Sequence, residues 1–116
     1  MIKKKYIIIH KRRHTFSSMA ATPEQLISRL REHGPALREK FGVRRLRVFG
    51  SLARGSAGPD SDVDVLVDFQ APTSAKRFYG LQFSLEDLLG RSVDLVTEKA
   101  LREEFRPIIE ANAISI

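Results

Sequence analysis

Two aspartates separated by one residue, Asp62 and Asp64, open an apolar segment near the middle of the chain. On a β-strand, residues i and i+2 project from the same face, roughly 7 Å apart along the chain. Carboxylates held in this way repel one another unless cations lie between them. Because Mg²⁺ prefers carboxylates and substrate phosphates as ligands, the pair predicts a site for Mg²⁺, with two ions expected. The alternative is the solvated face of an edge strand, an interpretation that also suits Asp68.

A Gly-Ser pair, Gly50-Ser51, precedes these aspartates by a fixed interval and directly follows an alternating apolar segment. Glycine lets a ligand approach the main chain closely, and serine offers an amide and a hydroxyl to phosphate oxygens. Taken alone, Gly-Ser is an ordinary turn, and it is not a Walker loop because Ser56 stands where that motif requires lysine. A hairpin-like connection of the flanking strands would bring phosphate contacts beside metal ligands. The combination indicates metal-dependent displacement at phosphorus of a nucleoside triphosphate.

Two further residues extend the candidate site. Asp94 lies in an otherwise apolar strand, where an unpaired charge is costly to bury, and it fits a third metal ligand that favours deprotonation of the attacking hydroxyl. Its alternative is a solvent-facing strand residue. Arg54 could neutralise triphosphate charge or form a surface ion pair. The histidines do not resemble a metal cluster, because His10, His14 and His33 are scattered, and Tyr79 suits the core or its rim better than catalysis.

The elements that must position these residues can be predicted from turn and capping signals. Thr22 as N-cap, Pro23 at the first helical position and Gln25 in a capping box predict a helix start. Gly34-Pro35 is expected to stop or break this helix, with a second short helical piece over 37–41. Strands are expected over 45–49, 63–69 and 92–96, with a turn over 50–60 in which 52–54 could begin a helix.

The second half of the chain predicts two more helices and completes the fold class. Residues 74–89 suit an amphipathic helix that ends at Gly90, with one apolar face formed by Phe78, Leu81, Leu85, Leu88 and Leu89. Thr97 is expected to cap a last helix through Leu101 and Phe105, which Pro107 interrupts. In the strand over 63–69, alternation places Val63, Val65 and Val67 on one face and Asp62, Asp64, Leu66 and Asp68 on the other. We predict a small α/β (α+β) domain, a mixed sheet flanked by helices.

Composition bounds the remaining possibilities. A chain of 116 residues without cysteine is one small domain without disulfides, compatible with the cytoplasm. Its net charge of +6 comes from the six basic residues of 1–18, because the rest holds 20 − 6 = 14 basic residues against 14 acidic ones. The core is therefore not expected to bind nucleic acid. We divide the chain into a basic extension, 1–18, and a domain, 19–116. The extension is interpreted as an upstream start artefact before Met19, a mobile arm or a short added strand.

Together these residues resemble the DNA polymerase β-like nucleotidyltransferase superfamily, whose signature is Gly-Ser, ten residues and Asp-x-Asp. The match runs from Gly50-Ser51 to Asp62-Val63-Asp64, and the surrounding residues look like the minimal nucleotidyltransferases (MNT domains) over about 22–116. The resemblance implies that Asp62 and Asp64 hold Mg²⁺, that Asp94 is the third ligand and orients the acceptor, and that Gly50 and Ser51 grip the triphosphate of ATP. It implies less for Arg54, whose role depends on loop geometry.

In the MNT group the implied role is that of an antitoxin, which transfers AMP from ATP to a tyrosine hydroxyl of a HEPN-domain toxin. The short chain leaves little room for a substrate pocket of its own, which also favours a protein acceptor and a hetero-oligomer. Two alternatives stay open. One is a binding-only antitoxin without catalysis, and the other is a small-molecule or RNA nucleotidyltransferase completed by dimerisation or by a separate substrate-binding subunit.

Overall fold

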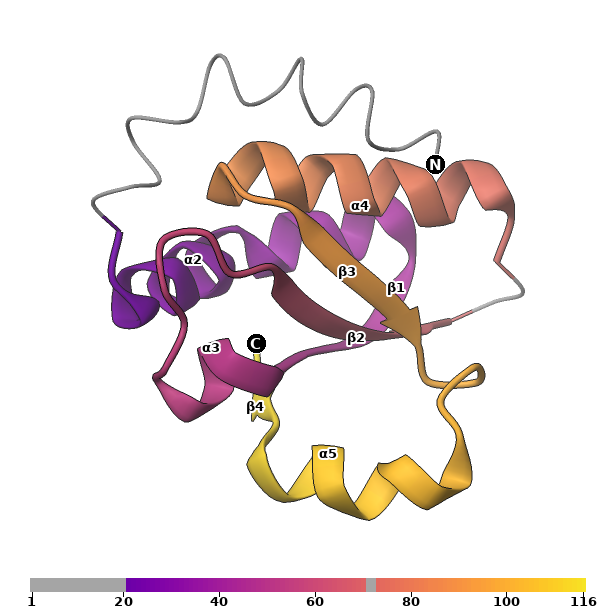
Figure 1. Cartoon of the computed structure of the whole chain (residues 1–116). Coiled ribbons are helices and arrows are strands. Elements are labelled where there is room, and N and C mark those ends of the chain that lie inside the picture. Colours follow the sequence, from indigo (N-terminus) through magenta and orange to yellow (C-terminus); the bar gives the residue numbers. More distant parts are fainter. Residues whose placement is uncertain (1–20, 71–72) are drawn as a thin grey trace.

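The structure is a computed structural model that describes residues 21–70 and 73–116 (Figure 1). Its centre is a four-stranded sheet in the order β3-β2-β1-β4. The strands are β1 (Val43–Phe49), β2 (Val63–Phe69), β3 (Val93–Thr97) and β4 (Ile114–Ser115). β1 runs antiparallel to β2 and β4, whereas β2 and β3 are parallel. This mixed sheet with flanking helices confirms the predicted fold class. The predicted extension, 1–18, lies outside the described residues.

Helices lie on both sides of this sheet. α2 (Pro23–Phe41) and α4 (Ala75–Leu89) share one side, and α5 (Arg106–Asn112) lies on the other, as Figure 1 shows. The short α3 (Gly50–Arg54) follows β1 directly, and a 3₁₀ turn, η1 (Glu103–Phe105), precedes α5. None of the helices in the described ranges is long and apolar enough to cross a bilayer.

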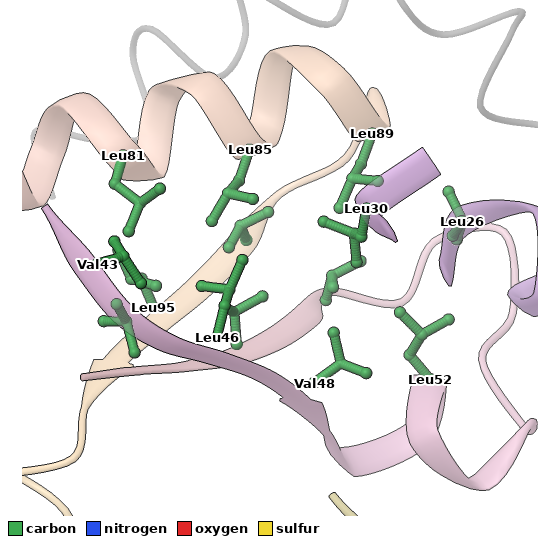
Figure 2. Close-up of a cluster of buried hydrophobic side chains, with 14 of the residues drawn as sticks. Leu26, Leu30, Val43, Leu46, Val48, Leu52, Leu81, Leu85, Leu89 and Leu95 are labelled. Atoms are coloured by element: carbon green, nitrogen blue, oxygen red, sulfur yellow. The ribbon is translucent and has the colours of Figure 1, made fainter. Parts of the chain in front are cut away.

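The hydrophobic core lies between the sheet and the α2–α4 layer (Figure 2). Leu81, Leu85 and Leu89 recur at four-residue spacing on α4 and are fully buried against alternate residues of the strands. Burying a leucine side chain contributes about 1.5–3 kcal/mol to the free energy of folding. Packing against this helix face therefore determines which residues of each strand point into the core. The predicted apolar face of this helix and its end at Gly90, which has left-handed dihedral angles, are confirmed.

The predicted break at Gly34-Pro35 is wrong, because α2 runs unbroken from Pro23 to Phe41. Proline removes one main-chain hydrogen bond, but packing on both sides of it holds the helix together. Leu30 before the proline is fully buried, and Phe41 after it packs against the core. The predicted capping box is confirmed: the Thr22 hydroxyl accepts from the Gln25 amide, and the Gln25 side chain accepts from the Thr22 amide.

The prediction for the C-terminal part is also wrong in its boundaries. Thr97 ends β3, and its hydroxyl accepts a hydrogen bond from the Ala100 amide at 3.2 Å, so it closes a turn and caps no helix. Pro107 lies in the first turn of α5, where its missing N–H removes no helical hydrogen bond, and it therefore helps to begin a helix. β4 was not predicted, because two residues carry too little periodicity to indicate a strand.

Candidate active site

The antiparallel register of β1 and β2 places the Gly50-Ser51 turn next to Asp64. Phe49, the last residue of β1, lies opposite Asp64, and Gly50 follows it with a left-handed φ of 71°. A Cβ atom built on Gly50 would overlap the carboxylate oxygen Oδ2 of Asp64. Only glycine leaves room at this point, so the close approach of main chain and carboxylate depends on its missing side chain. The predicted hairpin-like connection is confirmed.

The parallel register of β2 and β3 brings the third aspartate to the same place. Asp64 and Asp94 are direct partners on neighbouring strands. Asp94 lies between Val93 and Leu95, which are buried in the core, so its side chain leaves from the opposite face of the sheet. Asp62 precedes β2 by one residue and shares the side of Asp64 by the same alternation. The three aspartates therefore gather at one end of the face that points away from the core.

The pKa of Asp64 reflects its burial and the charges of the neighbouring predicted residues. Burial and then the negative charges of Asp94 and Asp62 raise the pKa of Asp64 above its ordinary value, whereas the Arg54 guanidinium opposes this shift. Within residues 21–70 and 73–116 no three such side chains already converge as ligands of one ion. The aspartates are neighbours that repel one another, and a divalent cation between them would relieve this repulsion. Donor set and charge therefore fit Mg²⁺.

The residues assigned to phosphate binding lie at the start and end of α3. Gly50 and Ser51 form its first turn, where helical amides lack partners within the helix, and in the part of the chain that the structure describes no side chain caps this end. Arg54 is exposed in its last turn. The alternative that 52–54 are helical is thus confirmed. Amide and hydroxyl donors, a guanidinium and carboxylates lie together, as binding a metal–triphosphate complex requires.

Three buried polar residues near the aspartates were missed from the sequence. Arg91, before β3, donates to the carbonyl of Gly58 at 2.7 Å and so ties down the loop that leads to Asp62. Gln82 and Glu86 on α4 are both 4% exposed and contact the main chain of β3. Their signal in the sequence is a pair of polar residues four apart that adjoins the leucines of the buried face of the helix.

Other polar features lie away from this end of the sheet. A cavity of about 350 Å³ is found at the opposite ends of β2 and β3, where Asp68, Thr97 and Glu98 are among its lining residues. His33 is exposed, and its ring nitrogen Nδ1 lies 3.0 Å from the Arg29 carbonyl, so it faces its own helix. Tyr79 is 48% exposed on the outer side of α4, at the surface and outside the core.

Similarity to known proteins identifies the family of this chain. The model of the nucleotidyltransferase domain family matches residues 30–116. The protein adenylyltransferase MntA of Thermococcus cleftensis is 51% identical over 81 residues, which cover 70% of this chain and 82% of that one. A candidate protein adenylyltransferase of Methanocaldococcus jannaschii is 38% identical over 88 residues, covering 75% and 90%.

Solved structures share the fold. A candidate minimal nucleotidyltransferase superposes with a TM-score of 0.74 at 39% identity, covering 84% of this chain and 98% of that one. A toxin–antitoxin structure with AMP-PNP superposes with a TM-score of 0.57 at 20% identity, covering 82% and 72%. The Gly-Ser turn, the paired aspartates on their strands and these relatives lead to one conclusion: the chain belongs to the nucleotidyltransferase domain family and is a nucleotidyltransferase of the minimal type.

Proposed function

We propose that this protein transfers AMP from ATP, with Mg²⁺, to a tyrosine hydroxyl of a partner HEPN-domain toxin and thereby acts as its antitoxin. The observation that carries the proposal is the contact between Gly50 and the Asp64 carboxylate, with Asp94 paired beside it. The close approach of the Gly50 main chain to these carboxylates supports a site in which the Gly50-Ser51 turn would bind the triphosphate beside a metal ion. Because ATP-dependent transfer to a newly made protein partner requires cytoplasmic nucleotide, we place the reaction in the cytoplasm.

Each residue has a defined part in this reaction. Asp62 and Asp64 would hold Mg²⁺ with the triphosphate, and Asp94 would complete the ligand set. When bound, the metal offsets charge on the attacking and leaving oxygens. Gly50 and Ser51 would bind phosphate oxygens through main-chain amides and the serine hydroxyl, while Arg54 adds positive charge at the end of α3.

The chemical step is a displacement at the α-phosphorus. The acceptor hydroxyl oxygen forms a bond to this phosphorus, the bond to the oxygen bridging the α- and β-phosphates breaks, and pyrophosphate leaves. Asp94 is exposed beside Asp64, which supports a role in which it would orient the hydroxyl and accept its proton. The product is a tyrosine that carries AMP through a phosphodiester bond, so no oxidant or further reactant is required.

A protein acceptor is supported by the relatives and by the size of the domain. The MntA relative, half identical in sequence, is named as a protein adenylyltransferase, and the toxin–antitoxin structure with AMP-PNP has the same fold. The described elements are one sheet and its covering helices, which supports an acceptor that this domain does not enclose. The acceptor would therefore bring its own surface, and we propose that this acceptor is a HEPN toxin in a hetero-oligomer with this protein.

The experiment is a transfer assay with the purified protein, Mg²⁺ and its partner toxin. We expect label from ATP to enter the toxin when the α-phosphate is labelled and not when the γ-phosphate is labelled. Adding a chelator should abolish transfer. Neutralisation of the toxin without any incorporation of label would instead identify a binding-only antitoxin, and label in RNA or a small molecule but not in the toxin would identify a different acceptor.

A further inference from the structure

Two buried polar side chains on α4 both contact the main chain of a single residue of β3. Gln82 Nε2 donates to the carbonyl oxygen of Val93 at 3.0 Å, and Glu86 Oε2 accepts from the Val93 amide at 3.0 Å. Gln82 and Glu86 are each 4% exposed, and Val93 is 2% exposed. Nonpolar residues normally fill a packed contact between a helix and a sheet, so two buried polar side chains at this place require a structural explanation.

The position of β3 in the sheet explains the role of Gln82 and Glu86. β3 is an outer strand whose sheet neighbour is β2. The Ser92 carbonyl accepts from the Val63 amide of β2 at 3.0 Å, so the polar groups of Val93 point the other way, toward the sheet edge. Gln82 and Glu86 occupy that edge and bond to both groups, as a further strand would. They thereby pair main-chain groups that burial would leave without water.

We infer that Gln82 and Glu86 are positioning residues that orient the carboxylate of Asp94. The inference rests on the proposed function, in which Asp94 is the third metal ligand. The Val93 carbonyl belongs to the peptide plane that ends at the nitrogen of Asp94. A hydrogen bond to that carbonyl therefore holds the plane from which the Asp94 side chain departs. The hydrogen bond from the Val93 amide to Glu86 holds the peptide plane between Ser92 and Val93. The carbonyl of this plane, that of Ser92, also accepts from the Val63 amide of β2.

The orientation of the Asp94 side chain depends on these main-chain hydrogen bonds, because few contacts restrain the side chain itself. The residue is exposed, and within residues 21–70 and 73–116 no side chain forms a hydrogen bond to its carboxylate. Its direction is thus set by its main chain, which lies in an edge strand of five residues. Asp64, its partner, lies on a strand paired on both sides. The α4 contacts give the outer strand a comparable restraint exactly where the third carboxylate departs from the sheet.

The test compares four variants of the full chain. Gln82→Met and Glu86→Met remove the two contacts at nearly constant volume, and Glu86→Gln keeps an oxygen that can accept from the Val93 amide. Leu81→Ala is the matched control, because it leaves a cavity on the same helix but removes neither of the hydrogen bonds to the Val93 main chain. Each variant is measured well below its Tm, for transfer to the toxin and for Mn²⁺ binding by electron paramagnetic resonance without nucleotide.

We expect Gln82→Met and Glu86→Met to lower kcat and weaken Mn²⁺ binding by about 10–100-fold, the range known for groups that support metal ligands. KM for ATP should change little, because the Gly50-Ser51 turn is untouched. Glu86→Gln should restore wild-type behaviour, and Leu81→Ala should lower Tm but keep kcat. If the Met variants match Leu81→Ala in both kcat and Mn²⁺ affinity, the positioning role is excluded.

The two proposals fail in different ways in this experiment. If the wild-type protein transfers no AMP to the toxin, the proposed function fails, and Mn²⁺ binding alone then decides the positioning role. Asp94→Asn serves as the reference for that decision. If Asp94→Asn binds Mn²⁺ as the wild type does, Asp94 is no metal ligand and the positioning role fails with it.

Discussion

At the level of single residues, a comparison of Gly50 with Gly55 distinguishes an effect on the site from an effect on the stability of the fold. Gly50 and Gly55 both have left-handed φ angles, 71° and 76°, but a Cβ atom meets the Asp64 carboxylate only at Gly50 and meets nothing within 4 Å at Gly55. Alanine at either position should lower the free energy of unfolding by about 1–2 kcal/mol through backbone strain.

The two alanine variants should differ in activity. We expect Gly50→Ala to abolish transfer, because its methyl group displaces the Asp64 carboxylate, which we propose as a metal ligand, and Gly55→Ala to keep the wild-type rate per folded molecule. Urea denaturation measures the strain and the transfer assay measures the site. Equal activity in the two variants would mean that the close approach of Gly50 to Asp64 has no role in catalysis.

Asp64 gives the metal-free protein a pH dependence whose sign can be worked out. Burial, Asp94 and Asp62 raise its pKa above the ordinary value of 3.8, although Arg54 opposes them. As pH rises from 3.8 through the higher folded-state pKa, the unfolded chain releases this proton first, so folding stability falls. Asp64→Asn should therefore be more stable than the wild type above that window and equal to it below pH 3.8.

Thermal melts of both proteins across this pH range, without metal, measure the difference. Added Mg²⁺ should raise the Tm of the wild type at neutral pH and have less effect on Asp64→Asn. A wild type that gains stability over Asp64→Asn as pH rises would contradict the electrostatic account of the site.

Much of the site was predictable at this scale because Gly50, Ser51, Asp62 and Asp64 lie within one short segment. Neighbouring strands joined by a turn can adopt few arrangements, so the spacing itself indicates the contact. The register of Asp94 with Asp64 joins residues thirty positions apart and depends on strand pairing that local signals do not specify. Gln82 and Glu86 were missed for a similar reason, since their partner is main chain from another element.

At the scale of elements, a buried arginine joins three parts of the fold. Arg47 on β1 bonds to Glu98 after β3 at 2.9 Å and to Glu110 on α5 at 3.4 Å. Burial raises the pKa of Glu98, but hydrogen bonds from Arg45 and Arg47 outweigh it and leave this pKa below its ordinary value. The charges therefore hold α5 on the face that carries the aspartates.

Arg47→Met should lower the free energy of unfolding by about 1.5–3 kcal/mol, the range for hydrogen bonds to charged groups. Arg44→Met is the matched control on the same strand, because its ion pair with Asp68 is largely exposed and worth at most about 1 kcal/mol. Urea denaturation compares the two variants. Equal losses would show that the buried network adds nothing specific to the docking of α5.

The element boundaries show where local signals are decisive and where packing overrides them. Thr22 and Ser74 cap their helices through hydrogen bonds to nearby amides, so these starts can be predicted from a few residues. Pro35 has a local preference against helix, but leucines and an aromatic ring on both sides of it pack into one core. Pro107 and the two residues of β4 take their roles from contacts made late in the chain.

At the scale of the whole molecule, the charge distribution predicts that the domain acts without its basic extension. Residues 1–18 carry the entire net charge of +6, and the remainder is neutral. A chain that begins at Met19 should keep its transfer rate and its Tm, and it should elute from a heparin column at lower salt because electrostatic attraction to polyanions is lost. A large loss of transfer would assign the extension a part in the reaction.

We propose that AMP is transferred to a protein partner at the site that the three aspartates form. Intact-mass spectrometry of the toxin, co-expressed with this protein or with its Asp62→Asn/Asp64→Asn variant, tests it most directly. We expect the toxin to gain the mass of one or more AMP units only with the wild-type protein. An unmodified toxin in both cases, held in a stable complex with either protein, would contradict it.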